Sequence, residues 1–139
     1  MEATAAGRPD QRFGREPAQE TSAPPAAPAM SIADPAPLGL AAFALTTFVL
    51  SIFNSGLMSE KGLPVVLGLA LAYGGFAQLL AGMWEFRNNN TFGATAFASY
   101  GAFWLSYWAL NQFFVGKIPA ASVGHAVGLY LIAWGIFTA

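Results

Sequence analysis

The sequence contains no cysteine and only one histidine, His125. The absence of cysteine excludes disulfides, thiolate metal sites and cysteine nucleophiles. A lone histidine without acidic neighbours does not make a metal site. No segment has the spacing of a phosphate-binding loop, a nucleophile–base set or a pair of carboxylates in one pocket. The sequence therefore predicts no catalytic residues, no metal and no cofactor, and we do not expect an enzyme.

Charge is also scarce, because charged residues make up 9% of the 139 residues, against about 25% in ordinary soluble domains. Beyond Asp34 the charged residues are Glu60, Lys61, Glu85, Arg87 and Lys117. The net charge of −1 leaves no basic surface for a nucleic acid. With 55% hydrophobic residues, the apolar surface exceeds what so few charges can cover in water. These features indicate an integral membrane protein whose solvent is the lipid bilayer.

The apolar residues are gathered into four runs, at about 36–58, 63–86, 92–115 and 122–139. A run of some 20 residues spans a hydrocarbon core of roughly 30 Å as a helix. The short connections at 59–62 and 87–91 require antiparallel neighbours. We expect an all-α, polytopic transmembrane helix bundle over 34–139, after a disordered tail at 1–33 rich in Ala, Pro, Glu and Arg. The fourth run is the shortest, so the domain is expected to be incomplete at its C-terminus.

Three of the predicted helices carry a polar stripe at helical spacing. The stripes are Phe43, Thr47, Ser51, Asn54 and Ser55; Gly74, Gln78, Gly82 and Glu85; and Thr91, Thr95, Ser99 and Ser106, with Tyr100, Tyr107 and Asn111 beside the last. Hydroxyls and amides on such stripes either hydrogen-bond between membrane helices or line a polar pathway. Residue patterns alone leave both interpretations open. Trp84, Trp104, Trp108 and Trp134 are expected to be interfacial or lipid-facing packing residues.

Glu85 lies at the end of the second run, beside Arg87. This position favours an interfacial, solvated carboxylate, whereas a buried position would make Glu85 a candidate for proton coupling. At the first helix, Asp34 can cap free N–H groups and proline suits the first turn.

Several motifs in order resemble the acetate uptake transporter family, also called succinate–acetate permeases. The first, Asp34-Pro35-Ala36-Pro37-Leu38-Gly39-Leu40, is similar to the NPAPLGL signature of that family. The resemblance continues through 73–78, 81–85, 90–97, 99–104 and 130–138, and so covers residues 34–138.

The resemblance implies transport of acetate or a similar small monocarboxylate, succinate included, by proton symport or channel-like passage. It also implies six helices and a homo-oligomer in the plasma (inner) membrane. It places a hydrophobic pore constriction at Phe43 and Tyr100, with a third member on a fifth helix that this chain lacks. We expect Thr47, Asn54, Gln78, Thr95 and Ser99 to line the substrate path.

The sequence departs from the family pattern in two ways. Asp34 replaces the Asn that opens the signature, and an ionised Asp at an anion entrance would repel a carboxylate. Helices five and six are absent, so the chain is expected to be truncated after the start of its fourth helix. The alternative to a transporter is a non-transporting membrane subunit or interaction partner whose polar stripes serve association.

Overall fold

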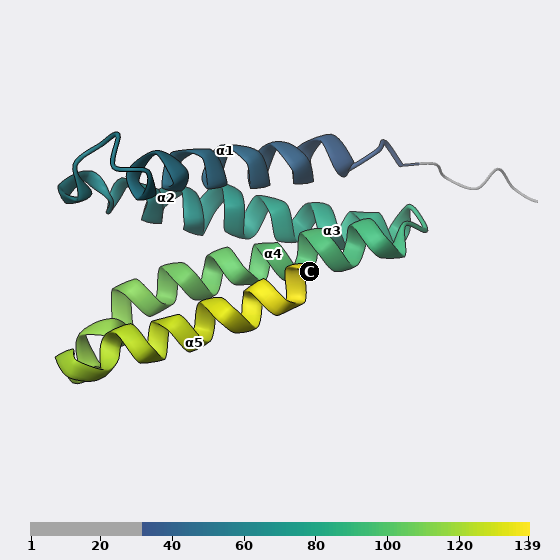
Figure 1. The fold of residues 1–139 in the computed structure, drawn as a ribbon. Coiled ribbons are helices and arrows are strands. Elements are labelled where there is room, and N and C mark those ends of the chain that lie inside the picture. Colours follow the sequence, from purple (N-terminus) through teal and green to yellow (C-terminus); the bar gives the residue numbers. More distant parts are fainter. Residues whose placement is uncertain (1–31) are drawn as a thin grey trace, which may run out of the picture. The chain divides into compact units, whose positions relative to one another are not determined.

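The computed structural model describes residues 32–139, which are helical almost throughout and contain no strand (Figure 1). The confirmed fold class is thus an all-α helix bundle. Its main helices are α1 (Ala36–Asn54), α2 (Val65–Leu71), α3 (Gln78–Arg87), α4 (Thr91–Ala109) and α5 (Ala120–Thr138). Four short elements join or extend them, namely η1 (Glu60–Gly62), the π-helical turns η2 (Ala72–Ala77) and η3 (Leu110–Phe114), and η4 (Val115–Lys117). The tail predicted at 1–33 lies, except for its last two residues, outside the described residues.

Local chemistry explains where the helices begin and end. At the entrance to α1, the Ala36 N–H donates to Asp34 Oδ1 over 2.9 Å, so Asp34 supplies an acceptor to the free end of the helix. After α1 the chain turns at Gly56, whose φ of +77° suits glycine. Between α3 and α4, Asn89 takes the left-handed conformation with φ 58°. The Asn90 side chain then accepts from Gly93 N at 3.0 Å and caps α4.

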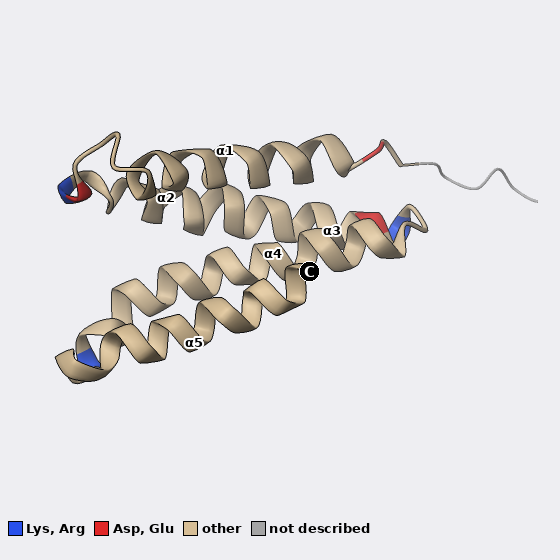
Figure 2. Cartoon of the chain, in the orientation of Figure 1, with Lys and Arg blue, Asp and Glu red and all other residues tan. Residues whose placement is uncertain are grey.

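Three segments of the described chain are long and apolar enough to cross a membrane, namely α1, the continuous α2–η2–α3 segment (Val65–Arg87) and α5. A 19-residue helix such as α1 is about 28 Å long, close to the thickness of a hydrocarbon core. Charged residues lie at the two ends of the bundle, and the helices between these ends carry none (Figure 2). The chain is therefore a membrane protein.

Helix α4 is not among these three segments, although a third span was predicted over 92–115. Its hydroxyl-bearing side chains, at Thr91, Thr95, Ser99, Ser106 and two tyrosines, make it more polar than α1, which has the same length. Because α4 packs along α3 and carries α5 on another side, we infer that it crosses the same layer. The residues of α4 that are buried are Gly93, Ala94, Phe97, Gly101 and Trp104, whereas Thr91 and Thr95 are exposed.

The tightest packing joins α3 to α4, and glycine permits it. A Cβ on Gly82 would lie 2.4 Å from Ala98 N, and a Cβ on Gly101 would lie 2.6 Å from Leu79 N. On the other side of the long second segment, Gly74 of η2 receives Thr46 of α1. The largest buried cluster comprises Phe53, Val66, Ala70 and Trp104. These contacts hold α1, α2–α3 and α4 together as one packed unit.

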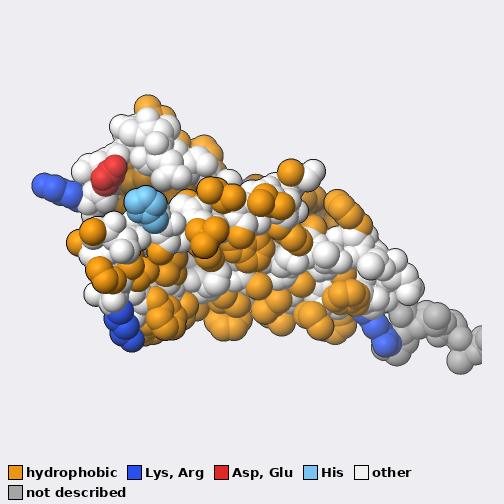
Figure 3. All heavy atoms as spheres, turned by 60° about the horizontal axis from the view of Figure 1, so that its bottom comes forward, with side chains coloured by type: hydrophobic (Ala, Val, Ile, Leu, Met, Phe, Trp, Pro, Cys, Tyr) orange, Lys and Arg blue, Asp and Glu red, His pale blue; other side chains and the backbone are white. Residues whose placement is uncertain are grey.

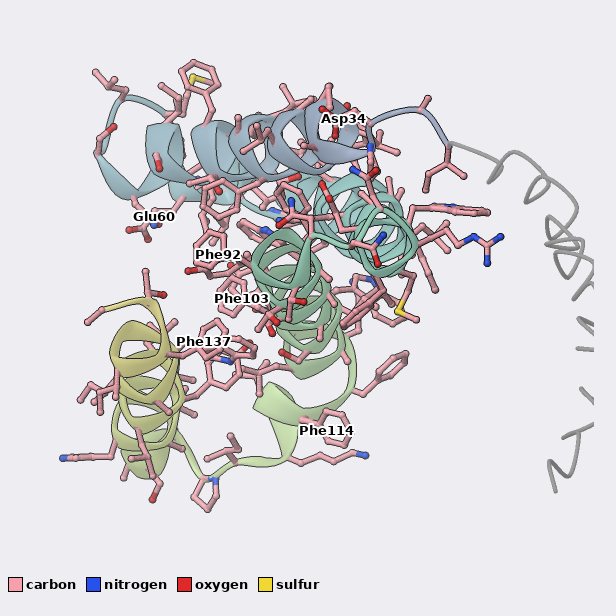
Figure 4. The ribbon with its side chains drawn as sticks, turned by 90° about the vertical axis from the view of Figure 1, so that its right-hand side faces the viewer. Asp34, Glu60, Phe92, Phe103, Phe114 and Phe137 are labelled. Carbon is pink, nitrogen blue, oxygen red and sulfur yellow. The ribbon has the colours of Figure 1, made fainter. Side chains whose placement is uncertain are left out.

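Helix α5 is held differently, since none of its residues is buried. Side chains join it to α4: Phe103 meets Trp134 with ring centroids 5.2 Å apart, and the Ser106 and Tyr130 hydroxyl oxygens are 2.7 Å apart. Figure 4 shows Phe103 of α4 and Phe137 of α5 in the space between the two helices. Large apolar side chains such as Leu129 and Ile136 remain more than 70% exposed, and apolar atoms dominate the face seen in Figure 3.

Candidate functional site: a path between α1, α4 and α5

Phe43 and Tyr100, the two predicted constriction residues, are in contact between α1 and α4, and Phe43 is 37% exposed. Phe43 comes from α1 and Tyr100 from α4, and their ring centroids are 5.3 Å apart at an interplanar angle of 47°. Tyr100 also contacts Phe137 of α5, with centroids 5.8 Å apart. The Tyr100 hydroxyl donates to Thr138 Oγ1 over 3.2 Å. Three helices therefore converge on this aromatic pair.

Two cavities of about 340 Å³ each share the Phe43–Tyr100 pair as a wall. We call the one nearer the start of α1 the entry cavity; its other lining residues are Ala36, Leu40, Gln78, Asn90, Phe92, Gly93, Ala96 and Phe97. The one further along α1 is the central cavity; its other lining residues are Thr47, Leu50, Ser51, Asn54, Phe103, Trp104, Leu131, Trp134, Gly135 and Thr138. Along both α1 and α4, entry-cavity residues precede the aromatic pair and most central-cavity residues follow it. The pair thus separates two hollows on one line.

A third cavity of about 260 Å³ continues this line beyond Asn54. It shares Leu50, Asn54, Phe103 and Leu131 with the central cavity. Its remaining lining residues are Tyr107, Leu110, Asn111, Val115, Val127 and Tyr130. The three cavities together follow α1 and α4 along most of their length.

The polar groups along this line are neutral. Gln78 is fully buried, and neither atom of its amide has a hydrogen-bond partner among the described residues. The Thr47 hydroxyl is likewise unpartnered within the part of the chain that the structure describes. Buried polar groups without partners are uncommon in folded proteins, and these two side chains both lie beside the cavities.

The other predicted path residues are placed less uniformly. Asn54 lines both the central and the third cavity. Thr95 lines a smaller cavity of about 160 Å³ beside Tyr100 and Phe137, and its hydroxyl donates to Thr91 O over 2.9 Å. Ser99 is half-buried and lines none of these cavities. Its assignment to the path stays a prediction without support from the cavity geometry.

Two residues of the signature segment contribute to the entry cavity. Ala36 and Leu40 line it directly. Gly39 faces Phe97, and a Cβ there would lie 2.6 Å from the Phe97 ring. Asp34 is exposed, accepts a hydrogen bond from Ala36 N at the start of α1, and does not line the entry cavity.

The expectation of a solvated Glu85 is wrong. Its side chain is fully buried, and neither carboxylate oxygen has a hydrogen-bond partner among the described residues. The error arose because Gly93 on α4 leaves room for the carboxyl: a Cβ on Gly93 would lie 3.1 Å from Glu85 Cδ. A close approach between two helices is not visible in the pattern of either one.

Tryptophan placement also needs correction. Trp104 is 2% exposed and Trp134 is partly buried, and both line the central cavity instead of facing lipid or the interface.

Ser51, Phe103 and Thr138 are further cavity residues that the predicted path omitted. Spacing offered a signal for Phe103 and for Trp104, since they follow Tyr100 by three and four residues on α4. No group of three or more potential metal ligands occurs within residues 32–139.

Comparison with known proteins matches residues 17–139 to the model of the GPR1/FUN34/yaaH family. The chain belongs to the GPR1/FUN34/yaaH family. Among curated relatives, Accumulation of dyads protein 2 of Saccharomyces cerevisiae is 50% identical in an alignment of 117 residues that covers 81% of this chain and 41% of the relative. Acetate permease A of Emericella nidulans is 47% identical in an alignment of 119 residues that covers 79% of this chain and 40% of that protein.

A bacterial relative and a solved structure extend this family assignment. The succinate-acetate/proton symporter SatP of Escherichia coli is 42% identical over 107 residues, covering 77% of this chain and 56% of SatP. The structure of the bacterial acetate channel SatP superposes with a TM-score of 0.68 at 42% identity, over 78% of this chain and 59% of the other. The chain thus spans about 40–56% of the length of these curated family members.

Proposed function

We propose that this chain forms part of a path that carries acetate or a similar small carboxylate across a membrane. The observation that carries the proposal is the Phe43–Tyr100 pair, with one cavity of about 340 Å³ on each side. A hollow, a narrow aromatic contact and a second hollow on one line are the parts that a selective passage needs. The names of three relatives, an acetate permease, a succinate-acetate/proton symporter and an acetate channel, support the same substrate class.

The chemistry of the lining suits a small anion in transit. A carboxylate is costly to move into hydrocarbon, and α1 and α4 contain no Lys or Arg that would trap it. Neutral donors such as the Gln78 amide and the Thr47 hydroxyl lower the barrier without holding the anion tightly. The substrate meets Gln78 in the entry cavity, passes between Phe43 and Tyr100, and then meets Thr47 and Asn54.

The proposal also covers a second substrate, the role of protons, the oligomeric state and the membrane. Succinate is a second substrate, protons move with or drive the anion, and the protein works as a homo-oligomer in the plasma membrane. The symporter name of the E. coli relative supports the first two points. The exposed apolar side chains of α5 support association with further helices.

The exposed apolar surface of α5 also favours a second function. In this alternative, the chain is a membrane subunit that packs against another polypeptide and does not itself transport. Among the described residues α5 has none that is buried, and the central cavity lies partly against it. In this case other helices complete the structure, and transport belongs to the assembly.

The test is uptake of labelled acetate by cells that lack their own acetate permease and express this chain, with and without a protonophore. Membrane insertion is confirmed in parallel. We expect saturable uptake that the protonophore lowers. The pair F43A and Y100A should change the rate and the selectivity for bulkier monocarboxylates. The matched control is F48A, because Phe48 lies on α1, is 61% exposed and lines none of the three cavities.

Absence of uptake by the correctly inserted chain would reject independent transport and favour the subunit function. Uptake and selectivity unchanged in both F43A and Y100A, with the same result in F48A, would reject the assignment of the constriction.

A further inference from the structure

Glu85 is the buried group that the path described above does not use. It is fully buried, at the end of α3, and both carboxylate oxygens lack a hydrogen-bond partner among the described residues. A buried carboxylate is normally paired or hydrogen-bonded, because desolvating an unpaired charge is costly. Glu85 is therefore an ionisable side chain that is buried without a partner among the described residues.

The Glu85 carboxyl lies directly behind the wall of the entry cavity. A Cβ placed on Gly93 would be 3.1 Å from Glu85 Cδ and 2.5 Å from Asn90 Nδ2, so the carboxyl and the Asn90 amide both lie beside Gly93 in the first turn of α4. Both Asn90 and Gly93 line the entry cavity. The Asn90 amide is held there because its oxygen accepts from Gly93 N at 3.0 Å.

Few other charges act on this carboxyl. Helix α3 packs against α4, α1 and η2. Their titratable or charged groups are Tyr100 and Tyr107 on α4, Asp34 just before α1, Tyr73 on η2, and Arg87 on α3 itself. Asp34 and Arg87 are exposed, where water screens their charges.

We propose that Glu85 is the proton-binding group that controls entry of the carboxylate substrate. When Glu85 is ionised, its negative charge repels an anion in the entry cavity. When it takes up a proton from the medium, the carboxyl is neutral and the anion enters. One proton bound thus accompanies one anion admitted. The inference rests on the proposed transport function and adds to it the residue and the sign of the pH dependence.

Coulomb's law sets the size of the effect. For two unit charges at a separation on the order of 10 Å and an effective dielectric constant of about 20, ionisation of Glu85 lowers anion occupancy about tenfold. Uptake per acetate anion should therefore be higher by about that factor when Glu85 is protonated than when it is ionised.

The first experiment measures acetate uptake against pH in E85Q, a permanently neutral variant of nearly the same shape. Uptake by cells without the protein is subtracted at each pH, and the rate is expressed per acetate anion, which removes diffusion of the neutral acid. We expect E85Q to lose the pH dependence and to match the parent's acidic rate at all pH values. The matched control is E60Q, because Glu60 is exposed on η1 and should keep the parent profile.

A second measurement does not require transport. Infrared difference spectra between mildly acidic and neutral pH should contain the carbonyl band of a protonated carboxylic acid in the parent and in E60Q, and lack that component in E85Q. If the parent transports but E85Q keeps the parent's pH profile, the inference fails while the proposed function stands. If no variant transports, the proposed function fails. Absence of the band difference between parent and E85Q then overturns the assignment of Glu85 as well.

Discussion

Substitution of Gly82 by alanine should separate α3 from α4. A Cβ at this position would lie 2.4 Å from Ala98 N, 2.9 Å from Ala98 Cα and 3.0 Å from Ala98 Cβ. Ordinary van der Waals contact begins at 3.4 Å, so the α4 backbone would have to move by about 1 Å. Backbone atoms cannot turn away as a flexible side chain can, and overpacking of this kind costs about 1–3 kcal/mol.

Alanine also favours a helix over glycine by up to about 1 kcal/mol, which opposes the clash. The control G68A separates the two effects, because Gly68 lies on the same continuous segment and a Cβ there would meet nothing within 4 Å. Relative to G68A, the unfolding midpoint of G82A should fall by roughly 4 °C or more. The assay is the fraction of folded protein that remains, by fluorescence-detected size exclusion, after heating.

The displacement also has a functional consequence, because α4 carries Tyr100. A shift of α4 would open the Phe43–Tyr100 contact, whose centroids are 5.3 Å apart. Equal midpoints for G82A and G68A would refute the packing argument, since the two variants differ mainly in the predicted clash.

Two further outcomes follow from buried polar groups and caps. T46V should leave the unfolding midpoint unchanged or raise it. Thr46 is fully buried and its hydroxyl has no hydrogen-bond partner among the described residues, and an unsatisfied buried group costs about 1–3 kcal/mol. A clear fall of the midpoint in the heating assay would show that the hydroxyl is hydrogen-bonded. N90A should cost about 1 kcal/mol, because the Asn90 side chain caps α4 through Gly93 N at 3.0 Å. N88A is its control, and equal stability of the two variants would contradict the capping role.

The helical bundle could be predicted because its signals are local. An uncharged run of membrane length specifies a span wherever it packs, and Asp34 and Asn90 mark helix starts by their own side chains. The central pair was predicted from the resemblance, and the two helices do bring Phe43 and Tyr100 together.

The parts that sequence did not predict depend on contacts between elements. The burial of Glu85 requires Gly93 on a different helix. Trp134 lies on α5, which is apolar on all sides, so no period in its sequence indicates which face meets α4. The π-helical turn η2 interrupts the second span between two regular helices, and the residues there carry no strong breaking signal apart from Gly74 and Gly75.

The most direct test of the proposed path uses the absence of cysteine from the chain. A single cysteine is introduced at Ser51, which lines the central cavity, or at Phe48, which is exposed on α1 and lines none of the three cavities along the path. Membranes opened to both sides are treated with a charged, membrane-impermeant thiol reagent, with and without acetate. The proposal predicts that S51C reacts, that acetate slows the reaction, and that F48C stays unlabelled in lipid. Equal labelling of the two cysteines, or labelling of S51C that acetate does not change, would contradict a carboxylate path between α1, α4 and α5.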